Sequence, residues 1–311
     1  MSVSDMSKVI VITGPTASGK TSLGIRLAQE IGGEIVSADS MQVYKHMDIG
    51  TSKPTEKEML GIPHYMIDIL SPQETCSVAR YVEDATAHIG DIMGRGKQPI
   101  LVGGSGLYID SLLLGYGFLS QGNSDVREML EADYDSLGGN AMLGKLREFD
   151  PESADRLSPN DKKRIVRAIE VYKTTGKTIS AHNIESKIAP PRYESAKYAL
   201  SFLNRADLYD RIDKRVDTMV ANGLENEVRK LLEMKVDVNS TAMQAIGYKE
   251  MVVAINDNCS IDDAIEKIKM ESRRYAKRQL TWLRRDERIT WITWDNEPDF
   301  DLALNTILRN A

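Results

Sequence analysis

Residues 14–21 have the types and the spacing of a loop that holds a di- or triphosphate. They fit the pattern G-x-x-x-x-G-K-[ST], in which the glycines let the backbone wrap closely around phosphate oxygens. Lys20 would add a point charge, and the hydroxyl of Thr21 can hold Mg²⁺. A chance match is the alternative, but the strand-like run before the pattern and the amphipathic segment after it favour a phosphate site. The residues expected to bind the phosphates are Gly14, Pro15, Thr16, Ala17, Ser18, Gly19, Lys20 and Thr21.

Three further charged residues are candidates for chemistry at this site. Asp39 follows a short apolar run, and a carboxylate beside a bound phosphate can act as a general base or orient a nucleophile. The alternative is that Asp39 caps a turn through a backbone hydrogen bond. Arg211 and Arg215 are four residues apart, so on a helix they share a face and can converge on one anion. Two solvated arginines paired with nearby aspartates are the alternative.

Basic residues gather in two segments, although the chain as a whole has a formal net charge of -6. One is 162–167, and the other is 273–285, where Tyr275 and Trp282 lie between the cations. Cations neutralise nucleic-acid phosphates and aromatic rings can stack on bases. The alternative for each segment is a solvated face whose aromatic residues turn to the core. The two segments together with 244–249 favour an extended polyanionic partner, because binding follows local patches rather than net charge.

The elements that must position these residues begin as alternating strands and helices. Ligands of open α/β sheets bind at the carboxyl ends of the strands, which places Asp39 near the phosphate loop. The strand that ends at Gly103 lacks the Asp with which many P-loop hydrolases support Mg²⁺, and Asp68 is an undistinctive substitute, so a plain ATPase or GTPase is disfavoured. The expected strands are 9–12, 34–39 and 63–70, and the segment 98–106 is expected to be a fourth strand that runs into a glycine turn. The expected helices are 22–31 and 77–93.

Strand signals fade from about residue 115 to 191, where breaks at glycine and proline separate expected helices. A strand is expected to return at 198–203, followed by a helix capped by Asp207. The expected fold class is α/β, a P-loop NTPase-like parallel sheet flanked by helices, with a helical insertion domain. The catalytic core would comprise 1–120 and 187–311, and the insertion 121–186. The remaining expected helices are 124–134, 141–149, 151–157, 161–174, 224–235, 243–255 and 261–285.

Composition excludes several classes of protein. Among the 311 residues 41% are hydrophobic and 28% charged, which is typical of a globular protein. No apolar run approaches a membrane span, and the N-terminus lacks a signal pattern, so a cytoplasmic protein is expected. Cys76 and Cys259 are the cysteines, far apart, and support neither a zinc site nor a disulfide framework.

Taken in order, several segments resemble those of the bacterial tRNA dimethylallyltransferase family, also called tRNA isopentenyltransferases. The phosphate loop alone is unspecific, whereas the ordered set, spread over residues 8–295, is highly specific. The segments are Gly-Pro-Thr-Ala-Ser-Gly-Lys-Thr at 14–21, Asp-Ser-Met-Gln at 39–42, Tyr-Lys-His-Met-Asp-Ile-Gly-Thr-Ser-Lys-Pro at 44–54, Leu-Val-Gly-Gly-Ser-Gly-Leu-Tyr at 101–108, Arg-Ile-Val-Arg-Ala-Ile-Glu-Val at 164–171, Arg-Ile-Asp-Lys-Arg-Val at 211–216, Ala-Ile-Gly-Tyr-Lys-Glu at 245–250 and Lys-Arg-Gln-Leu-Thr-Trp-Leu-Arg at 277–284.

The resemblance implies transfer of a dimethylallyl group from dimethylallyl diphosphate to N6 of adenosine 37 of tRNA, with Mg²⁺ as cofactor. It assigns Asp39 as the base, Arg215 and Arg211 to the diphosphate, and Thr21 to the metal. It also implies that the insertion embraces the anticodon stem, and a monomer without membrane attachment is expected. The residues implied to contact tRNA are Asp39, Ser40, Met41, Gln42, Ser105, Arg127, Lys163, Arg164, Arg167, Gln244, Gly247, Tyr248, Lys249, Lys277, Arg278, Gln279, Trp282 and Arg284.

Departures from the family pattern are small. Ser105 stands where Thr is common but keeps the hydroxyl, and Lys163 stands where relatives often carry other polar residues. Three alternatives remain open: a P-loop kinase of a small metabolite, an isopentenyltransferase that uses free adenylate, and a non-catalytic tRNA- or nucleotide-binding protein. The basic segments argue against the first, the helical insertion against the second, and the presence of Lys20, Thr21 and Asp39 together against the third.

Overall fold

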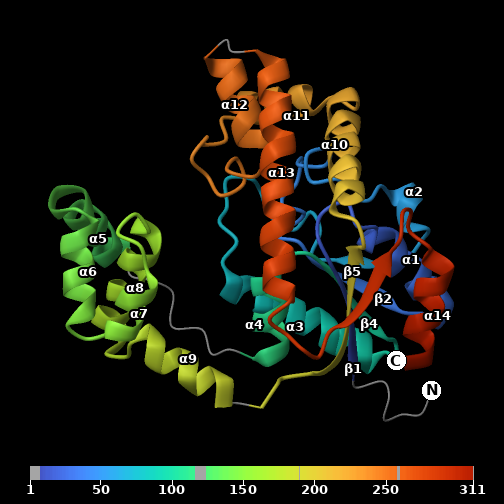
Figure 1. Ribbon diagram of the computed structural model, residues 1–311, viewed down its shortest axis with the longest axis horizontal. Coiled ribbons are helices and arrows are strands. Elements are labelled where there is room, and N and C mark those ends of the chain that lie inside the picture. The colour runs from blue at the N-terminus through green and yellow to red at the C-terminus, as the bar shows by residue number, and fades with distance from the viewer. Residues whose placement is uncertain (1–7, 116–123, 189, 258–259, 311) are drawn as a thin grey trace. The chain divides into compact units, whose positions relative to one another are not determined.

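Figure 1 shows the computed structural model of the chain, which describes residues 8–115, 124–188, 190–257 and 260–310. The chain divides into two compact units. The first comprises residues 1–113 and 193–311, and the second comprises 114–192. The first unit contains the sheet and the phosphate loop, and the second is helical.

Within the described residues, six strands form one parallel sheet in the order β3-β2-β4-β1-β5-β6. This confirms the expected α/β class with a parallel sheet flanked by helices. Strands buried on both faces are rich in β-branched residues, as the run Val9–Ile12 is. The strands are β1 (Lys8–Thr13), β2 (Glu34–Ala38), β3 (His64–Tyr65), β4 (Pro99–Gly103), β5 (Glu194–Phe202) and β6 (Thr290–Trp294).

Helices cover both faces of the sheet. On one face, Ile10 and Ile12 of β1 pack with residues of α1 (Lys20–Ile31), α10 (Arg205–Ala221), α13 (Ile261–Leu283) and α14 (Phe300–Asn310). On the other face, Val9 and Val11 pack with α3 (Val78–Gly94) and α4 (Gly106–Leu114). This alternation follows from the two-residue period of a strand. A third hydrophobic cluster joins the loop after β2 to α11 (Leu224–Glu233) and α12 (Tyr248–Asn256). The short helix α2 spans Glu56–Met59.

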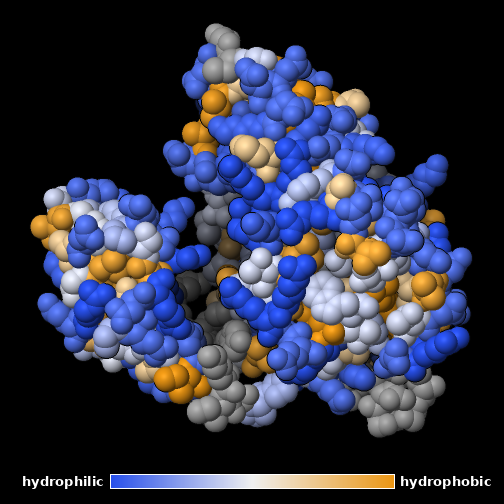
Figure 2. All heavy atoms as spheres, viewed as in Figure 1, coloured by the Kyte–Doolittle hydropathy of each residue, from blue (hydrophilic) through white to orange (hydrophobic). Residues whose placement is uncertain are grey.

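The helical unit has its own core, formed by residues such as Leu130, Leu146 and Ile165. Its helices are α5 (Ser124–Leu137), α6 (Gly139–Arg147), α7 (Pro151–Arg156), α8 (Lys162–Thr175) and α9 (Ile179–Ile188). On the face drawn in Figure 2, hydrophilic residues cover most of the surface and hydrophobic ones form small groups between them. None of the helices in the described part of the chain is long and apolar enough to cross a membrane.

Some predictions of elements are wrong, and some observed elements were not predicted. The strand expected at 63–70 is reduced to His64–Tyr65, because Met66 and Asp68 adopt positive φ angles of 64° and 55° that end it. Asn204, not Asp207, caps α10, since its side-chain oxygen accepts a hydrogen bond from the Ala206 N–H. The helix expected at 243–255 begins only at 248. The elements not expected from the sequence are α2, α4, α9, β6 and α14.

Candidate active site

The phosphate loop connects β1 to α1 and has a conformation that only glycine permits at its ends. Gly14 has a φ of +145°, and a Cβ there would lie 2.8 Å from the carbonyl oxygen of Leu200. Gly19 precedes α1 with a φ of 91° and offers no side-chain oxygen to cap the helix. Because the first amides of a helix need acceptors, the N-terminus of α1 is suited to an anion.

Side chains from distant parts of the sequence hold this loop. The amide of Gln279 in α13 accepts a hydrogen bond from the Thr16 N–H (2.9 Å) and donates one to the Gly104 carbonyl (3.0 Å). Trp294 at the end of β6 donates its indole N–H to the Ser18 carbonyl over 3.0 Å. The loop is therefore positioned by α13, by β6 and by the turn after β4, as well as by its own glycines.

Lys20 begins α1 and points back across the loop, where its Nζ donates to the Pro15 carbonyl over 2.7 Å. Burial, reinforced by the positive charge of Arg215, lowers the pKa of Lys20 to about 7, and Asp39 opposes this shift. A bound anion would favour the protonated amine. In addition, the hydroxyl of Ser18 is buried and has no hydrogen-bond partner among the described residues.

Arg215 in α10 lines the cavity and contacts two loops. Its Nη1 donates to Thr16 Oγ1 (2.9 Å) and its Nε to Ser52 Oγ (3.0 Å). Burial lowers the pKa of Arg215, and the charge of Asp39 opposes that shift. No carboxylate of the described residues forms an ion pair with its guanidinium, so its charge is available to an anion. Thr16 and Ser52 hold it through neutral hydroxyls instead.

Arg211, one helical turn earlier, has a different environment. Its Nη1 pairs with Glu297 at 2.6 Å and its Nε donates to the Ala17 carbonyl at 3.3 Å. Neighbouring aspartates do not neutralise the two arginines, because Asp213 pairs with Arg273. Both arginines therefore reach the phosphate loop. Arg211 has an acidic partner in Glu297, whereas Arg215 has none among the described residues.

Asp39 follows β2 and lines the same cavity, of about 910 Å³, as Lys20, Thr21 and Arg215. Its Oδ1 accepts a hydrogen bond from the Met41 N–H at 2.9 Å. The turn contact predicted as the alternative is therefore present, and it uses one of the two carboxylate oxygens. A half-buried carboxylate beside two cations can accept a proton from a bound substrate.

Thr21 also lines the cavity, one residue into α1. Among the described residues, no group of three His, Cys, Asp or Glu side chains is arranged to hold a metal ion. A hydroxyl is a ligand that Mg²⁺ accepts when phosphate oxygens and water complete its coordination shell. The residues present therefore fit a cation that enters together with a phosphate ligand.

The residues predicted to contact RNA fall into three groups. Gln42 and Gln279 are buried but line the cavity, and Ser105 accepts a hydrogen bond from the Ser40 N–H at 3.0 Å. Trp282 is half-buried and donates its indole N–H to Asp110. The exposed members are Arg127, Lys163, Arg164, Gln244, Lys277, Arg278 and Arg284.

Tyr248 is a correction to the predicted RNA interface. Its side chain is fully buried, and its hydroxyl donates to Glu227 at 2.6 Å, so it offers no surface to an RNA. Gly247 is also buried, whereas Lys249 beside it is half-exposed. In the helical unit, Arg127 and Arg167 both donate to the buried carboxylate of Glu170, leaving two guanidinium groups side by side near its surface.

Sequence reasoning missed three residues that support the cavity, which are Ser52, Glu227 and Trp294. It named Gln279 only as an RNA contact and not as a brace of the phosphate loop. Ser52 lies in the segment Asp-Ile-Gly-Thr-Ser-Lys that matched the family, and that match was the signal for it. Glu227 and Trp294 carried no signal, because the backbone groups that they bind lie more than a hundred residues away in the sequence.

Comparison with known proteins identifies the family. The family model described as "IPP transferase" matches residues 42–286. A tRNA dimethylallyltransferase of Acetivibrio thermocellus is 48% identical over 297 residues, 95% of this chain and 94% of that protein. The crystal structure of a tRNA isopentenylpyrophosphate transferase from Bacillus halodurans has a TM-score of 0.72 and 40% identity, with 97% of this chain and 96% of that one covered. A eukaryotic dimethylallyltransferase acting on tRNA has a TM-score of 0.84 and 30% identity, with 97% and 77% covered. The chain therefore belongs to the IPP transferase family.

Proposed function

We propose that this protein is a tRNA dimethylallyltransferase, which transfers the dimethylallyl group of dimethylallyl diphosphate to N6 of adenosine 37 in tRNA. The product would be N6-isopentenyladenosine beside the anticodon. The observation that carries the proposal is that Lys20, Arg215 and Asp39 line one cavity, with two cations suited to a diphosphate and a carboxylate suited to an amino group. The names of the relatives agree with it.

The residues have complementary roles in this reaction. The allylic C–O bond to the diphosphate breaks and the bond from N6 to the allylic carbon forms, while the amino group loses a proton. We assign to Asp39 the acceptance of that proton. Lys20, Arg215 and the amides of the phosphate loop would stabilise the negative charge that develops on the departing diphosphate. Mg²⁺, which we expect Thr21 to hold together with diphosphate oxygens, would neutralise further charge on the leaving group.

The adenine must leave the stack of the anticodon loop to present its amino group in a protein cavity. We propose that Gln42 and Gln279, which line the cavity, contact the extruded nucleotide, and that the exposed cations bind the RNA backbone. The helical insertion, predicted over 121–186, would contact the anticodon stem through residues such as Arg164. We propose that the protein acts as a monomer in the cytoplasm, where tRNA is found.

The turn after β4 argues against a kinase or hydrolase. Gly103 occupies the position where such enzymes often carry an Asp, and a Cβ there would lie 2.2 Å from the Ala38 carbonyl oxygen. No side chain fits at this position without moving β2. The site therefore binds phosphate groups without the carboxylate that phosphoryl transfer often uses.

The test is a transfer assay with purified protein, Mg²⁺ and dimethylallyl diphosphate labelled in the allyl group. We expect label to enter a tRNA with adenosine at position 37, and not a tRNA that differs only by guanosine there. Label in free AMP but not in tRNA would support an adenylate isopentenyltransferase instead. Phosphorylation by ATP without prenyl transfer would support a kinase.

A further inference from the structure

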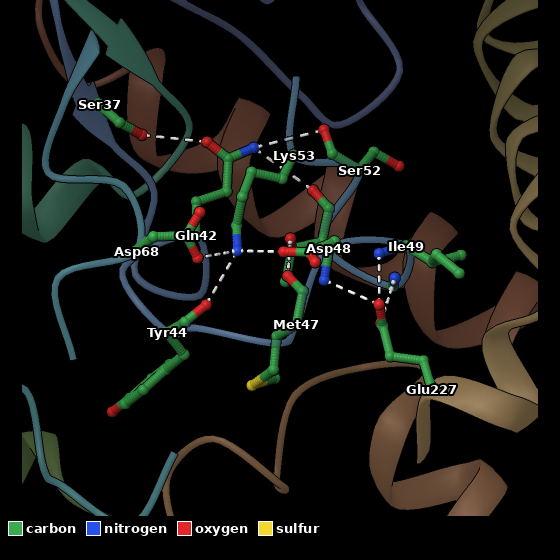
Figure 3. Close-up of polar contacts among 12 residues, drawn as sticks. Ser37, Gln42, Tyr44, Met47, Asp48, Ile49, Ser52, Lys53, Asp68 and Glu227 are labelled. Carbon is green, nitrogen blue, oxygen red and sulfur yellow. Dashed lines mark hydrogen bonds and ion pairs between the residues drawn. The ribbon is translucent and has the colours of Figure 1, made fainter. Parts of the chain in front are cut away.

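Glu227, a buried residue outside the proposed catalytic set, accepts hydrogen bonds from three consecutive backbone N–H groups through its carboxylate. Glu227 in α11 accepts hydrogen bonds at Oε2 from the N–H groups of Asp48 (2.9 Å) and Ile49 (2.8 Å). Its Oε1 accepts from the Gly50 N–H (3.1 Å) and from the Tyr248 hydroxyl (2.6 Å). Figure 3 shows the carboxylate pointing into the loop. Such a set of bonds to a charged acceptor is strong, and each amide would be costly to leave unpaired.

The loop that Glu227 grips, residues 47–53, is fixed from other sides as well. Lys53 donates to the Tyr44 carbonyl (3.0 Å) and pairs with Asp48 and Asp68 (Figure 3). Gly50 permits close packing of Tyr248, since a Cβ at Gly50 would lie 2.5 Å from the tyrosine ring. The loop is therefore held in one conformation by a carboxylate, an ammonium group and an aromatic ring.

This loop ends at the arginine of the active site. Ser52 accepts the Nε–H of Arg215 at 3.0 Å, and the carbonyl of Thr51 lies 3.4 Å from Nη2. Gln42 lies within 3.5 Å of the carbonyls of Thr51 and Ser52 and ties them to the segment that follows Asp39. The far side of Arg215 rests on Thr16 of the phosphate loop. The guanidinium thus has contacts on both loops, and we infer that those on loop 47–53 depend on Glu227.

We propose that Glu227 is a positioning residue for Arg215 and so for the diphosphate, which rests on the proposed function of the site. Without its carboxylate, the amides of 48–50 lose their acceptors, the loop relaxes, and Ser52 moves away from Nε. Arg215 then keeps its charge but loses one of the contacts that aim it. Displacement of a positioning group by about 1 Å can cost on the order of a hundredfold in rate.

The test measures binding of Mg²⁺-pyrophosphate by calorimetry, which needs no prenyl transfer and no tRNA. Glu227→Gln keeps the side-chain volume but places the NH2 of a carboxamide, which is a donor, against backbone N–H groups. We expect it to weaken the binding of Mg²⁺-pyrophosphate about tenfold. Glu225→Gln is the matched control, because Glu225 lies on the same helix, is more exposed and pairs with Arg229. We expect that control to bind within about twofold of the unsubstituted protein.

The decisive comparison is made in an Arg215→Ala background. If Glu227 acts through Arg215, adding Glu227→Gln there should change pyrophosphate affinity by less than about twofold. An equal tenfold loss with and without Arg215 would overturn the proposal, because it would reveal a general structural role. Should Glu227→Gln not fold, as judged by circular dichroism, Ser52→Ala removes the same anchor, and unchanged binding by Ser52→Ala would refute the coupling. A protein that binds pyrophosphate in this pattern but prenylates no tRNA would refute the proposed function alone.

Discussion

The protonation of Lys20 should make diphosphate binding weaken as pH rises through neutrality. The pKa of its amine is lowered to about 7 by burial and by Arg215, against an ordinary value of 10.5. A diphosphate brings negative charge beside the amine and therefore raises this pKa in the complex. Binding is consequently fully developed below pH 7 and declines above it until the pKa of the complex is reached.

The magnitude follows from the protonated fraction of Lys20 in the free protein. That fraction is about 0.9 at pH 6, 0.5 at pH 7 and 0.09 at pH 8, for a pKa of about 7. Pyrophosphate affinity should thus fall about tenfold between pH 6 and pH 8 from this group alone. The assay is a series of calorimetric titrations with Mg²⁺-pyrophosphate at half-unit pH intervals from 6 to 9.

The ligand titrates in the same range, so the comparison needs a matched variant. Lys20→Arg keeps a positive charge over the whole interval, since a guanidinium stays protonated, and it experiences the same changes in pyrophosphate. We expect the dissociation constant of the unsubstituted protein, divided by that of Lys20→Arg, to grow about tenfold from pH 6 to pH 8. A constant ratio would refute the assignment of a neutral pKa to Lys20, and a ratio that shrinks would refute its role as an anion ligand.

Three other substitutions test separate parts of the site. Asp39→Asn should lower single-turnover prenyl transfer about 10²- to 10⁴-fold while tRNA affinity stays within about twofold; unchanged transfer would remove Asp39 from the proton transfer. Arg164→Ala should weaken tRNA binding and reduce the slope of log K against log salt by about one, as for the loss of a phosphate contact, and pyrophosphate binding should be unchanged. Trp294→Phe removes the indole donor to Ser18 and should lower the free energy of unfolding by about 1 kcal/mol, measured in urea, and also weaken pyrophosphate binding; loss of neither would show that this bond is dispensable.

Local patterns predict the part of the site that a short segment builds by itself. The strand, the phosphate loop and α1 follow one another within 24 residues, and Asp39 ends the next strand, so periodicity and the strand-end rule suffice. The fold class and the helical segment were predictable for the same reason. Arg215 required the family resemblance as well, because helical spacing alone does not show which face of α10 turns to the cavity.

Contacts between segments that are far apart in the chain could not be predicted from the sequence. Tyr248 was assigned to RNA, yet it lies in the core, because only the packing of α12 on α11 decides which residue of Gly247–Lys249 turns inward. β6 escaped notice because its residue types do not alternate, since the exposed Trp291 is apolar like the buried Ile292 beside it. The carboxylate of Glu227 is ordinary in sequence and gains its role from amides 177 to 179 positions away.

The bond from Trp294 to Ser18 joins a strand near the end of the chain to a loop near its beginning. During synthesis the ribosome makes the phosphate loop well before β6, because Trp294 lies 276 residues after Ser18. A nascent chain therefore cannot form this bond until β6 has been translated, and the edge of β5 that pairs with β6 stays unpaired until then. Premature termination before Trp294 would release a polypeptide with the complete phosphate-loop sequence but without the hydrogen bond from Trp294 that helps to position it.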